Sequence, residues 1–211
     1  MASLADCPKS RREARRESRR DAILQVASDS FLKCGYADTT MSEIAATLGG
    51  SKGTLWNYFP SKELLFNAVL DRLTRDFRAQ LTVILNTRGD VETTLRRFCE
   101  EFLRKVTAPE SIALYRLVIS EANRFPEVGR VFYDRGPQAT RQQLADYLSV
   151  AMEGGMLRKA DCLRAAGQLI GLCLGGSHQR LLVGAIERVE RGQLDEDIDR
   201  AMEIFMRGYA P

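Results

Sequence analysis

Histidine, tryptophan and proline are scarce in this chain, whose 211 residues include one His, one Trp and six Pro. His178 has no obvious serine or cysteine partner for a nucleophilic triad, and a lone histidine is more often a packed or surface residue than a ligand. The sequence also lacks a glycine-rich phosphate-binding loop and a cluster of metal-ligand residues. We therefore expect no catalytic residues, no metal site and no cofactor, and we do not expect an enzyme.

Long apolar runs are missing as well. The longest lies around Leu169 to Leu174 and is far shorter than the ~20 residues that a membrane-spanning helix needs. Charged residues near the N-terminus occupy the place where a signal peptide has its apolar core. We expect a soluble, cytoplasmic protein without a membrane partner.

The five cysteines, Cys7, Cys34, Cys99, Cys162 and Cys173, are odd in number and widely spaced. Without a C-x-x-C pair they match neither a zinc site nor a disulfide framework. The simplest interpretation is that they are small buried apolar residues in a reducing compartment. A redox-sensing thiol is the alternative, and it would need a lowered pKa that a sequence does not show.

Apolar residues recur with a 3.6-residue period along almost the whole chain, which predicts an all-α fold of about nine or ten helices. Pro109, Pro126 and Pro137 suit the first turns of helices, and Gly35 suits a helix end. The expected helices cover about residues 11 or 16 to 34, 40–49, 51–59, 61–86, 91–107, 110–123, 126–135, 137–153, 161–189 and 195–209.

The net charge of +3 is unevenly distributed. Residues 1–62 hold 10 Lys/Arg and 7 Asp/Glu, whereas the remaining residues hold 21 of each. The excess positive charge therefore lies in the first third of the chain, most of it in an arginine-rich stretch over residues 11–20. Such an asymmetry is typical of a segment that binds nucleic acid.

Two short helices within residues 40–59 are joined by a tight turn, which is a helix-turn-helix arrangement. Thr40–Glu43 matches a capping box, in which the Thr hydroxyl and the Glu side chain each satisfy a free backbone N–H. Ala45 is small where the two helices cross, and Gly49 allows the positive φ of a sharp turn. Leu55 and Phe59 lie four residues apart and are expected to anchor the second helix inward.

The opposite face of this second helix carries polar and aromatic side chains. Lys52, Thr54, Trp56 and Asn57 provide a cation, a hydroxyl, an indole N–H and an amide, and Gly53 leaves room for a close backbone approach. This combination suits the major groove of DNA. An ordinary short solvated helix is the alternative interpretation.

The run SKGTLWNYFPSKE at residues 51–63, with the pattern before it, closely resembles the N-terminal domain of TetR-family transcriptional regulators over about residues 16–77. The other positions that carry the resemblance are Asp21–Leu24, Phe31, Gly35-Tyr36, Thr40–Ala46 and Leu65-Phe66. The resemblance implies an all-α bacterial homodimer that binds a palindromic operator and usually represses until a small molecule binds. It implies three parts: a frayed or disordered basic arm over residues 1–15, a DNA-binding domain over 16–77, and a ligand-binding and dimerisation domain over 78–211.

The family's DNA contacts carry over where residues match. The recognition helix contributes contacts to bases or phosphates, the start of the preceding helix can receive a phosphate, and Lys62 resembles a phosphate-contacting lysine. The implied DNA-binding residues are Thr40, Met41, Ser42, Ser51, Lys52, Gly53, Thr54, Trp56, Asn57, Tyr58 and Lys62. Two positions depart from the family pattern, since Trp56 replaces the usual Tyr and Gly50 stands where Val is common.

The arginines before this domain, among them Arg15, Arg16 and Arg19, are spaced in pairs four residues apart. On a helix they form a basic stripe, and unfolded they are able to follow a minor groove. A solvated extension without a DNA contact is the alternative. We expect the arm to add sequence-independent affinity.

The C-terminal part is similar to the AefR-type domain of the same family, on Leu114–Ala122, Phe125–Glu127, Phe132-Tyr133 and Phe205–Pro211. The resemblance places a ligand cavity between the long helix that begins at Ser61 and the helices after it. The candidate ligand-binding residues are Leu70, Phe77, Phe98, Cys99, Phe102, Leu117, Glu121, Phe132, Gln143 and Tyr147. Ordinary core packing is the alternative for the apolar ones, and a structural salt bridge for Glu121.

Small residues are spaced four apart at Gly167, Gly171 and Gly175. Glycine costs about 1 kcal/mol in a helix relative to alanine, so a close helix–helix approach is expected there. With Tyr147, these glycines are the candidate dimer interface, in agreement with a four-helix bundle between two subunits. The sequence thus predicts a ligand-controlled DNA-binding repressor; control by thiol oxidation or by a partner protein is the alternative.

Overall fold

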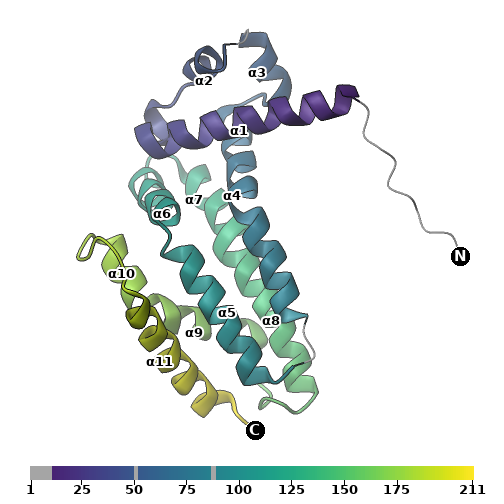
Figure 1. Ribbon diagram of the computed structural model, residues 1–211, viewed down its shortest axis with the longest axis vertical. Helices are drawn as coiled ribbons and strands as arrows, with labels where there is room; N and C mark the ends of the chain where they lie inside the picture. Colours follow the sequence, from purple (N-terminus) through teal and green to yellow (C-terminus); the bar gives the residue numbers. More distant parts are fainter. Residues whose placement is uncertain (1–10, 50–51, 87–88) are drawn as a thin grey trace, which may run out of the picture. The chain divides into compact units, whose positions relative to one another are not determined.

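The computed structural model describes residues 11–49, 52–86 and 89–211, and within these ranges all regular elements are helices (Figure 1). The predicted all-α fold is therefore confirmed. The elements are α1 (Arg11–Asp38), α2 (Met41–Thr47), α3 (Lys52–Tyr58), α4 (Lys62–Leu85), α5 (Val91–Val106), α6 (Pro109–Glu121), α7 (Pro126–Tyr133), the π-helical turn η1 (Asp134–Gln138), α8 (Ala139–Glu153), α9 (Cys162–Leu174), α10 (Ser177–Leu182) and α11 (Arg191–Tyr209). The chain forms two compact units, Met1–Val69 and Leu70–Pro211, whose boundary lies inside α4.

The first unit is built on one apolar stripe of α1. Ile23 and Leu24 are almost fully buried, as is Phe31 two turns later, which is the pattern of a helix with one face in a core. The rings of Phe31, Tyr36 and Phe66 contact one another with centroids 5.2 to 5.7 Å apart. These ring contacts hold the end of α1 against the first turns of α4.

The turns of the first unit follow the sequence prediction. Gly35, at φ 86° and ψ 170°, interrupts the helical backbone of α1 at the expected helix end. Thr40 Oγ1 accepts a hydrogen bond from the Glu43 N–H at 3.2 Å, and the Glu43 carboxylate accepts one from the Thr40 N–H at 3.1 Å. Gly49 has a φ of 63° in the turn after α2. The predicted capping box and the positive φ at Gly49 are both confirmed.

The arginine-rich stretch is helical wherever the structure describes it. α1 begins at Arg11, so Arg11–Arg15 form its first turns. Of the two arrangements that the sequence allows, the structure therefore has the basic stripe on a helix for these five residues. Residues 1–10 lie outside the described part of the chain.

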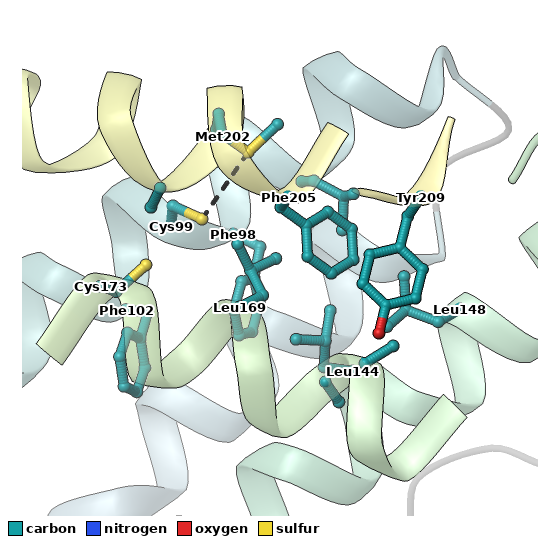
Figure 2. Packing of buried hydrophobic residues seen from close by; sticks show 14 of the residues in the cluster. Phe98, Cys99, Phe102, Leu144, Leu148, Leu169, Cys173, Met202, Phe205 and Tyr209 are labelled. Atoms are coloured by element: carbon teal, nitrogen blue, oxygen red, sulfur yellow. Dashed lines mark hydrogen bonds between the residues drawn. The ribbon is translucent and has the colours of Figure 1, made fainter. Parts of the chain in front are cut away.

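The apolar core of the second unit lies between α5, α8, α9 and α11, as Figure 2 shows. Phe98 of α5 is fully buried, and its ring stacks on that of Phe102 with centroids 5.8 Å apart. Phe205 and Tyr209 of α11 stack in the same way at 4.6 Å. Large apolar side chains at helical spacing on each of these helices account for the packing.

The expected single helix over residues 161–189 is wrong. The chain turns at Gly175 and Gly176, so that α9 ends at Leu174 and the short α10 follows. Asp197 of α11 provides the reason, because its carboxylate accepts a hydrogen bond from the Ser177 N–H at 2.8 Å and so holds the start of α10. A Cβ on residue 176 would overlap this carboxylate, which makes Gly176 the residue that permits the turn.

Two other helix boundaries also differ from the prediction. α11 begins at Arg191 rather than at Asp195, and the Gln193 side chain accepts a hydrogen bond from the Glu190 N–H at its start. The chain between α7 and α8 continues through η1, which contains Pro137. A π-helical turn has no clear periodicity signal, which explains why the sequence indicated two separate helices there.

Gly176→Ala is expected to lower the free energy of unfolding by about 0.5–2 kcal/mol, because the added methyl group displaces the Asp197 carboxylate from the Ser177 N–H that it caps. Thermal and denaturant unfolding of the purified variant measure the change. Gly208→Ala is the matched control, since a Cβ there meets no atom within 4 Å. Equal stability of the two variants would contradict the assigned role of Gly176.

Candidate nucleic-acid interface and internal pocket

Helix α3 has an apolar face in the core of the first unit and a polar face outside it. Leu55 and Phe59 are 2% and 5% exposed, as the sequence predicted. On the other face Gly53, Trp56 and Asn57 are exposed. Exposure of a large aromatic side chain on a short helix has no benefit for folding, since burial would stabilise it. The outer face of α3 is therefore available to another molecule.

The other predicted DNA-binding residues surround this face in different ways. Met41 and Ser42 are half-buried at the start of α2, and the Thr40 hydroxyl is engaged with Glu43. Lys52 begins α3, whereas Ser51 lies outside the described residues. The remaining two are half-buried side chains of α3, Thr54 and Tyr58.

Lys62 has a different environment from the one implied by the family resemblance. Its ammonium donates hydrogen bonds to the carbonyl oxygens of Tyr36 at 2.8 Å, Thr39 at 3.1 Å and Ala37 at 3.3 Å. It also lies 4.4 Å from the centroid of the Tyr36 ring. An ammonium has three donors, and three carbonyls after the kink of α1 receive them. Lys62 therefore joins the end of α1 to the start of α4, and a phosphate contact is not needed to explain it.

The arginines of α1 divide into two groups. Arg19 donates to the carbonyl of Leu48 at 3.4 Å, and Arg20 lies over the Phe59 ring at 5.5 Å, so both stabilise the unit itself. The side chains of Arg15 and Arg16, by contrast, are exposed, as are those of Arg11 and Arg12 one turn earlier. Tyr58 of α3 donates to the main-chain carbonyl of Arg16 at 3.4 Å, which connects α3 to this basic turn.

The second unit contains an internal pocket of about 100 Å³. Its walls are mostly apolar and come from α4 to α9 and η1, with Phe77, Phe102 and Phe132 among them. The complete lining is Leu73, Thr74, Phe77, Arg78, Phe102, Lys105, Val106, Glu110, Ser111, Leu114, Tyr115, Phe132, Arg135, Gly136, Pro137, Thr140, Ile170 and Leu174. The volume is below the roughly 300–1,000 Å³ of drug-sized sites, so a ligand of that size requires the walls to move apart.

Three of the ten candidate ligand-binding residues, Phe77, Phe102 and Phe132, line this pocket. The other seven do not line this pocket. Phe98 and Cys99 belong to the core in Figure 2, and Leu70 and Leu117 are buried elsewhere. Glu121 is half-buried at the end of α6, whereas Gln143 and Tyr147 line a separate open groove along α4 and α8.

Several residues of the pocket carried no recognisable signal in the sequence. Arg135 and Pro137 reach the pocket because η1 inserts a wide turn before α8. Lys105 and Tyr115 lie at positions that suit an ordinary solvated or core face of their helices. The one sequence feature that could have indicated the irregular turn is the run Arg135-Gly136-Pro137, since glycine and proline interrupt regular helices.

Two ionisable groups pack together at one wall of the pocket: Tyr115, which is half-buried and lines it, and the buried His178. The Tyr115 ring packs edge-on against Phe132 at 4.9 Å and against His178 at 5.4 Å. Burial raises the pKa of Tyr115 and lowers that of His178. Both groups are therefore neutral near pH 7. Within the described part of the chain His178 Nε2 has no hydrogen-bond partner, so His178 is a packed residue, as expected for a lone histidine.

The buried cysteines are poor candidates for a redox sensor. Cys99 and Cys173 are fully buried, and Cys99 Sγ contacts Met202 Sδ at 3.9 Å (Figure 2). The hydrogen bond with Cys173 and burial raise the pKa of Cys99 well above its usual value, which disfavours the reactive thiolate. Cys34 is exposed and Cys162 half-buried, and Cys7 lies outside the described residues.

The glycines predicted for a dimer interface have different environments. A Cβ on Gly167 would lie 3.2 Å from the Arg141 guanidinium, so this glycine makes room for a side chain of α8 in the same chain. Gly175 ends α9, and Gly171 is exposed with open space around its Cα. The need for glycine is therefore explained within one chain at residue 167, but not at residues 171 and 175.

The geometry of the first unit defines a class of protein. A capped short helix, a tight turn with positive φ and a second helix with an exposed polar face make a helix-turn-helix DNA-binding protein. Across the described ranges, no group of metal-ligating side chains and no helix long and apolar enough to span a bilayer is found.

Comparison with known proteins gives the family. Residues 23–69 match the model of the bacterial regulatory proteins of the tetR family, and residues 93–211 match that of the AefR-like transcriptional repressor C-terminal domain. The chain belongs to the TetR family of bacterial transcriptional regulators. Members of this family are regulators of transcription and not enzymes.

Individual relatives agree with this assignment. The chain is similar to the transcriptional regulator RutR of Escherichia coli K12, with 31% identity over 115 residues, which are 54% of this chain and 46% of RutR. The chain thus spans about half the length of the curated relatives it matches. A TetR-family regulator from Mesorhizobium loti has a similar structure over 96% of this chain and all of its own, with a TM-score of 0.81 and 26% identity. The flavonoid-responsive regulator FrrA is similar over 92% of this chain and 98% of its own, with a TM-score of 0.78 and 28% identity.

Lys62→Met is expected to lower the free energy of unfolding of the first unit by about 1–3 kcal/mol, because three half-buried carbonyls lose a charged donor. Denaturant unfolding followed by the fluorescence of Trp56, the single tryptophan, measures the loss. The salt dependence of DNA affinity should stay unchanged.

Lys33→Met, at an exposed position of α1, is the control and should leave both quantities unchanged. If Lys62→Met instead keeps its stability and lowers the slope of log K against log salt by about 0.9, the lysine contacts a phosphate.

Proposed function

We propose that this protein is a ligand-responsive transcriptional repressor that binds a palindromic operator as a homodimer and leaves it when a small apolar effector binds. The observation that supports DNA binding is the exposed outer face of α3, which holds Trp56 and Asn57. Leu55 and Phe59, on the other face, anchor the helix in the core. A short helix presented in this way fits the major groove, and two copies related by a two-fold axis read two half-sites.

The internal pocket of the second unit is the proposed effector site. Apolar walls with a few polar side chains are typical of small-molecule sites. FrrA, whose fold is similar, is described as flavonoid-responsive, and the AefR-like domain is described as that of a repressor. These descriptions support a small effector and repression in this chain.

Helix α4 is the proposed connection between effector and DNA. It begins with Lys62 in the first unit, and further along it Leu73 and Phe77 line the pocket. An effector that moves these side chains acts on the same helix that is joined to the end of α1. By linkage, the effector must bind the DNA-incompetent state better, and operator DNA must weaken effector binding by the same factor.

The homodimer is proposed from the family and from the surface of α8 and α9. Val150 and Leu163 are exposed at 65% and 39%, and Gly171 leaves open space on α9. Apolar side chains and small residues on two neighbouring helices suit a bundle with a second copy. Control by oxidation of Cys99 or Cys173 is not favoured, because both thiols are fully buried.

Trp56→Ala is expected to weaken binding to a sequence-specific operator about tenfold or more, since it removes a side chain from the reading face. The operator is obtained by selecting duplexes from a random pool with the wild-type protein, and affinities follow from fluorescence anisotropy of labelled DNA. Binding to a scrambled duplex should change little.

Leu64→Ala, which truncates an exposed apolar side chain on α4, is the matched control and should bind as the wild type does. Wild-type affinity of the Trp56 variant would refute α3 as the reading helix.

Replacing Arg11, Arg12, Arg15 and Arg16 with Gln is expected to weaken binding to operator and scrambled DNA alike. Each phosphate that an arginine no longer neutralises lowers the slope of log K against log salt by about 0.9. Glutamine keeps the helix propensity of α1, so circular dichroism should not change. An unchanged slope of log K against log salt would show that the first turns of α1 do not contact DNA.

A further inference from the structure

The cationic side chains of the internal pocket are not equally neutralised. Three cations, Arg78, Lys105 and Arg135, and one carboxylate, Glu110, are among its lining residues. Arg135 binds both carboxylate oxygens of Asp71 at 2.7 and 2.8 Å, and Arg78 lies 3.5 Å from the same carboxylate. The Asp71 carboxylate thus neutralises the two arginines and does not pair with Lys105.

Lys105 has a neutral partner instead. Its ammonium donates to the main-chain carbonyl of Leu73, on α4, at 2.9 Å. Among the described residues no carboxylate lies within ion-pair distance of Lys105, although Glu110 lines the same pocket. Of the three ammonium donors, the carbonyl receives one, and two are left for water or a ligand.

The surroundings of this ammonium are apolar. Lys105 is half-buried on α5, and both Phe102 and Val106 on the same helix line the pocket with it. A cation beside an apolar wall loses part of its hydration, which costs free energy. An anion bound against the cation offsets this cost, and the attraction between the two charges is stronger there than it is in water. The other walls, which include Phe77 and Phe132, offer mostly apolar surface to the rest of a ligand.

We propose that the effector is an apolar anion, a molecule with a flat or elongated apolar body and one acidic group, whose charge binds Lys105. The apolar body lies between Phe77, Phe102 and Phe132, and the acidic group accepts hydrogen bonds from the two remaining donors of the ammonium. This inference rests on the proposed function, in which the pocket is the effector site.

A simpler role for the lysine makes the opposite prediction. A lysine stem is able to cover apolar surface while its ammonium remains in water, without any ligand. In that case the loss of the charge would affect anionic and neutral ligands equally. A pair of ligands that share an apolar body and differ in charge therefore separates the two roles.

The experiment compares two fluorescent probes, 1-anilinonaphthalene-8-sulfonate and N-phenyl-1-naphthylamine, which share a ring system and differ by the sulfonate. Lys105→Met keeps the apolar stem and removes the charge. We expect this variant to bind the sulfonate at least tenfold more weakly and the neutral probe within twofold of wild type. Lys159→Met, at an exposed position, is the matched control and should change neither affinity.

Phe132→Ala locates the bound probe, because truncation of a pocket wall should weaken both probes. Decanoate, but not decanol at the same concentration, should displace the sulfonate from wild type. Thermal unfolding of each variant checks that it is folded.

The inference is overturned if Lys105→Met leaves sulfonate binding unchanged or weakens both probes equally. It is also overturned if the wild-type protein binds neither probe, or if Phe132→Ala leaves both affinities unchanged. DNA is absent from these measurements, so their failure is distinct from failure of the proposed function. That function is decided by the Trp56→Ala comparison on the selected operator.

Discussion

One cation holds together the segment on which the DNA-binding unit depends. The Lys62 ammonium donates to three carbonyls after the kink at Gly35 and lies over the Tyr36 ring. Hydrogen bonds from a charged donor to half-buried carbonyls are stronger than neutral ones, and losing the donor leaves the carbonyls unsatisfied. The end of α1 and the start of α4 are thereby joined at one point, and α2 and α3 connect the same two ends along the chain.

In the second unit the helices surround a pocket without filling it. A corner at Gly176, capped by Asp197, ends α9 early, and the wide turn η1 turns Arg135 and Pro137 toward the pocket. Both are interruptions of regular helix. Continuous helices pack side chains against one another at native density, whereas interruptions displace backbone and leave space between them.

Much of the fold was predictable because its signals are local. The capping box at Thr40, the positive φ at Gly49 and the buried pair Leu55 and Phe59 each depend on residues within one or two turns of one another. The break at Gly176 was not predictable, since its cause is Asp197, 21 residues further along the chain. Likewise, Lys62 matched a family motif, and only its contacts with carbonyls 23 to 26 residues away assign it to the junction.

The sequence by itself determined the all-α class, the helix-turn-helix and the exposed outer face of α3, because periodicity and caps act over a few residues. Tertiary structure alone decided which side chains meet in the pocket. Phe77, Phe102 and Phe132 look like many other apolar residues at helical spacing, and the seven other candidates lie elsewhere. Whether an apolar side chain fills a core or lines a pocket depends on what the facing helix leaves open, and that depends on contacts across the whole unit.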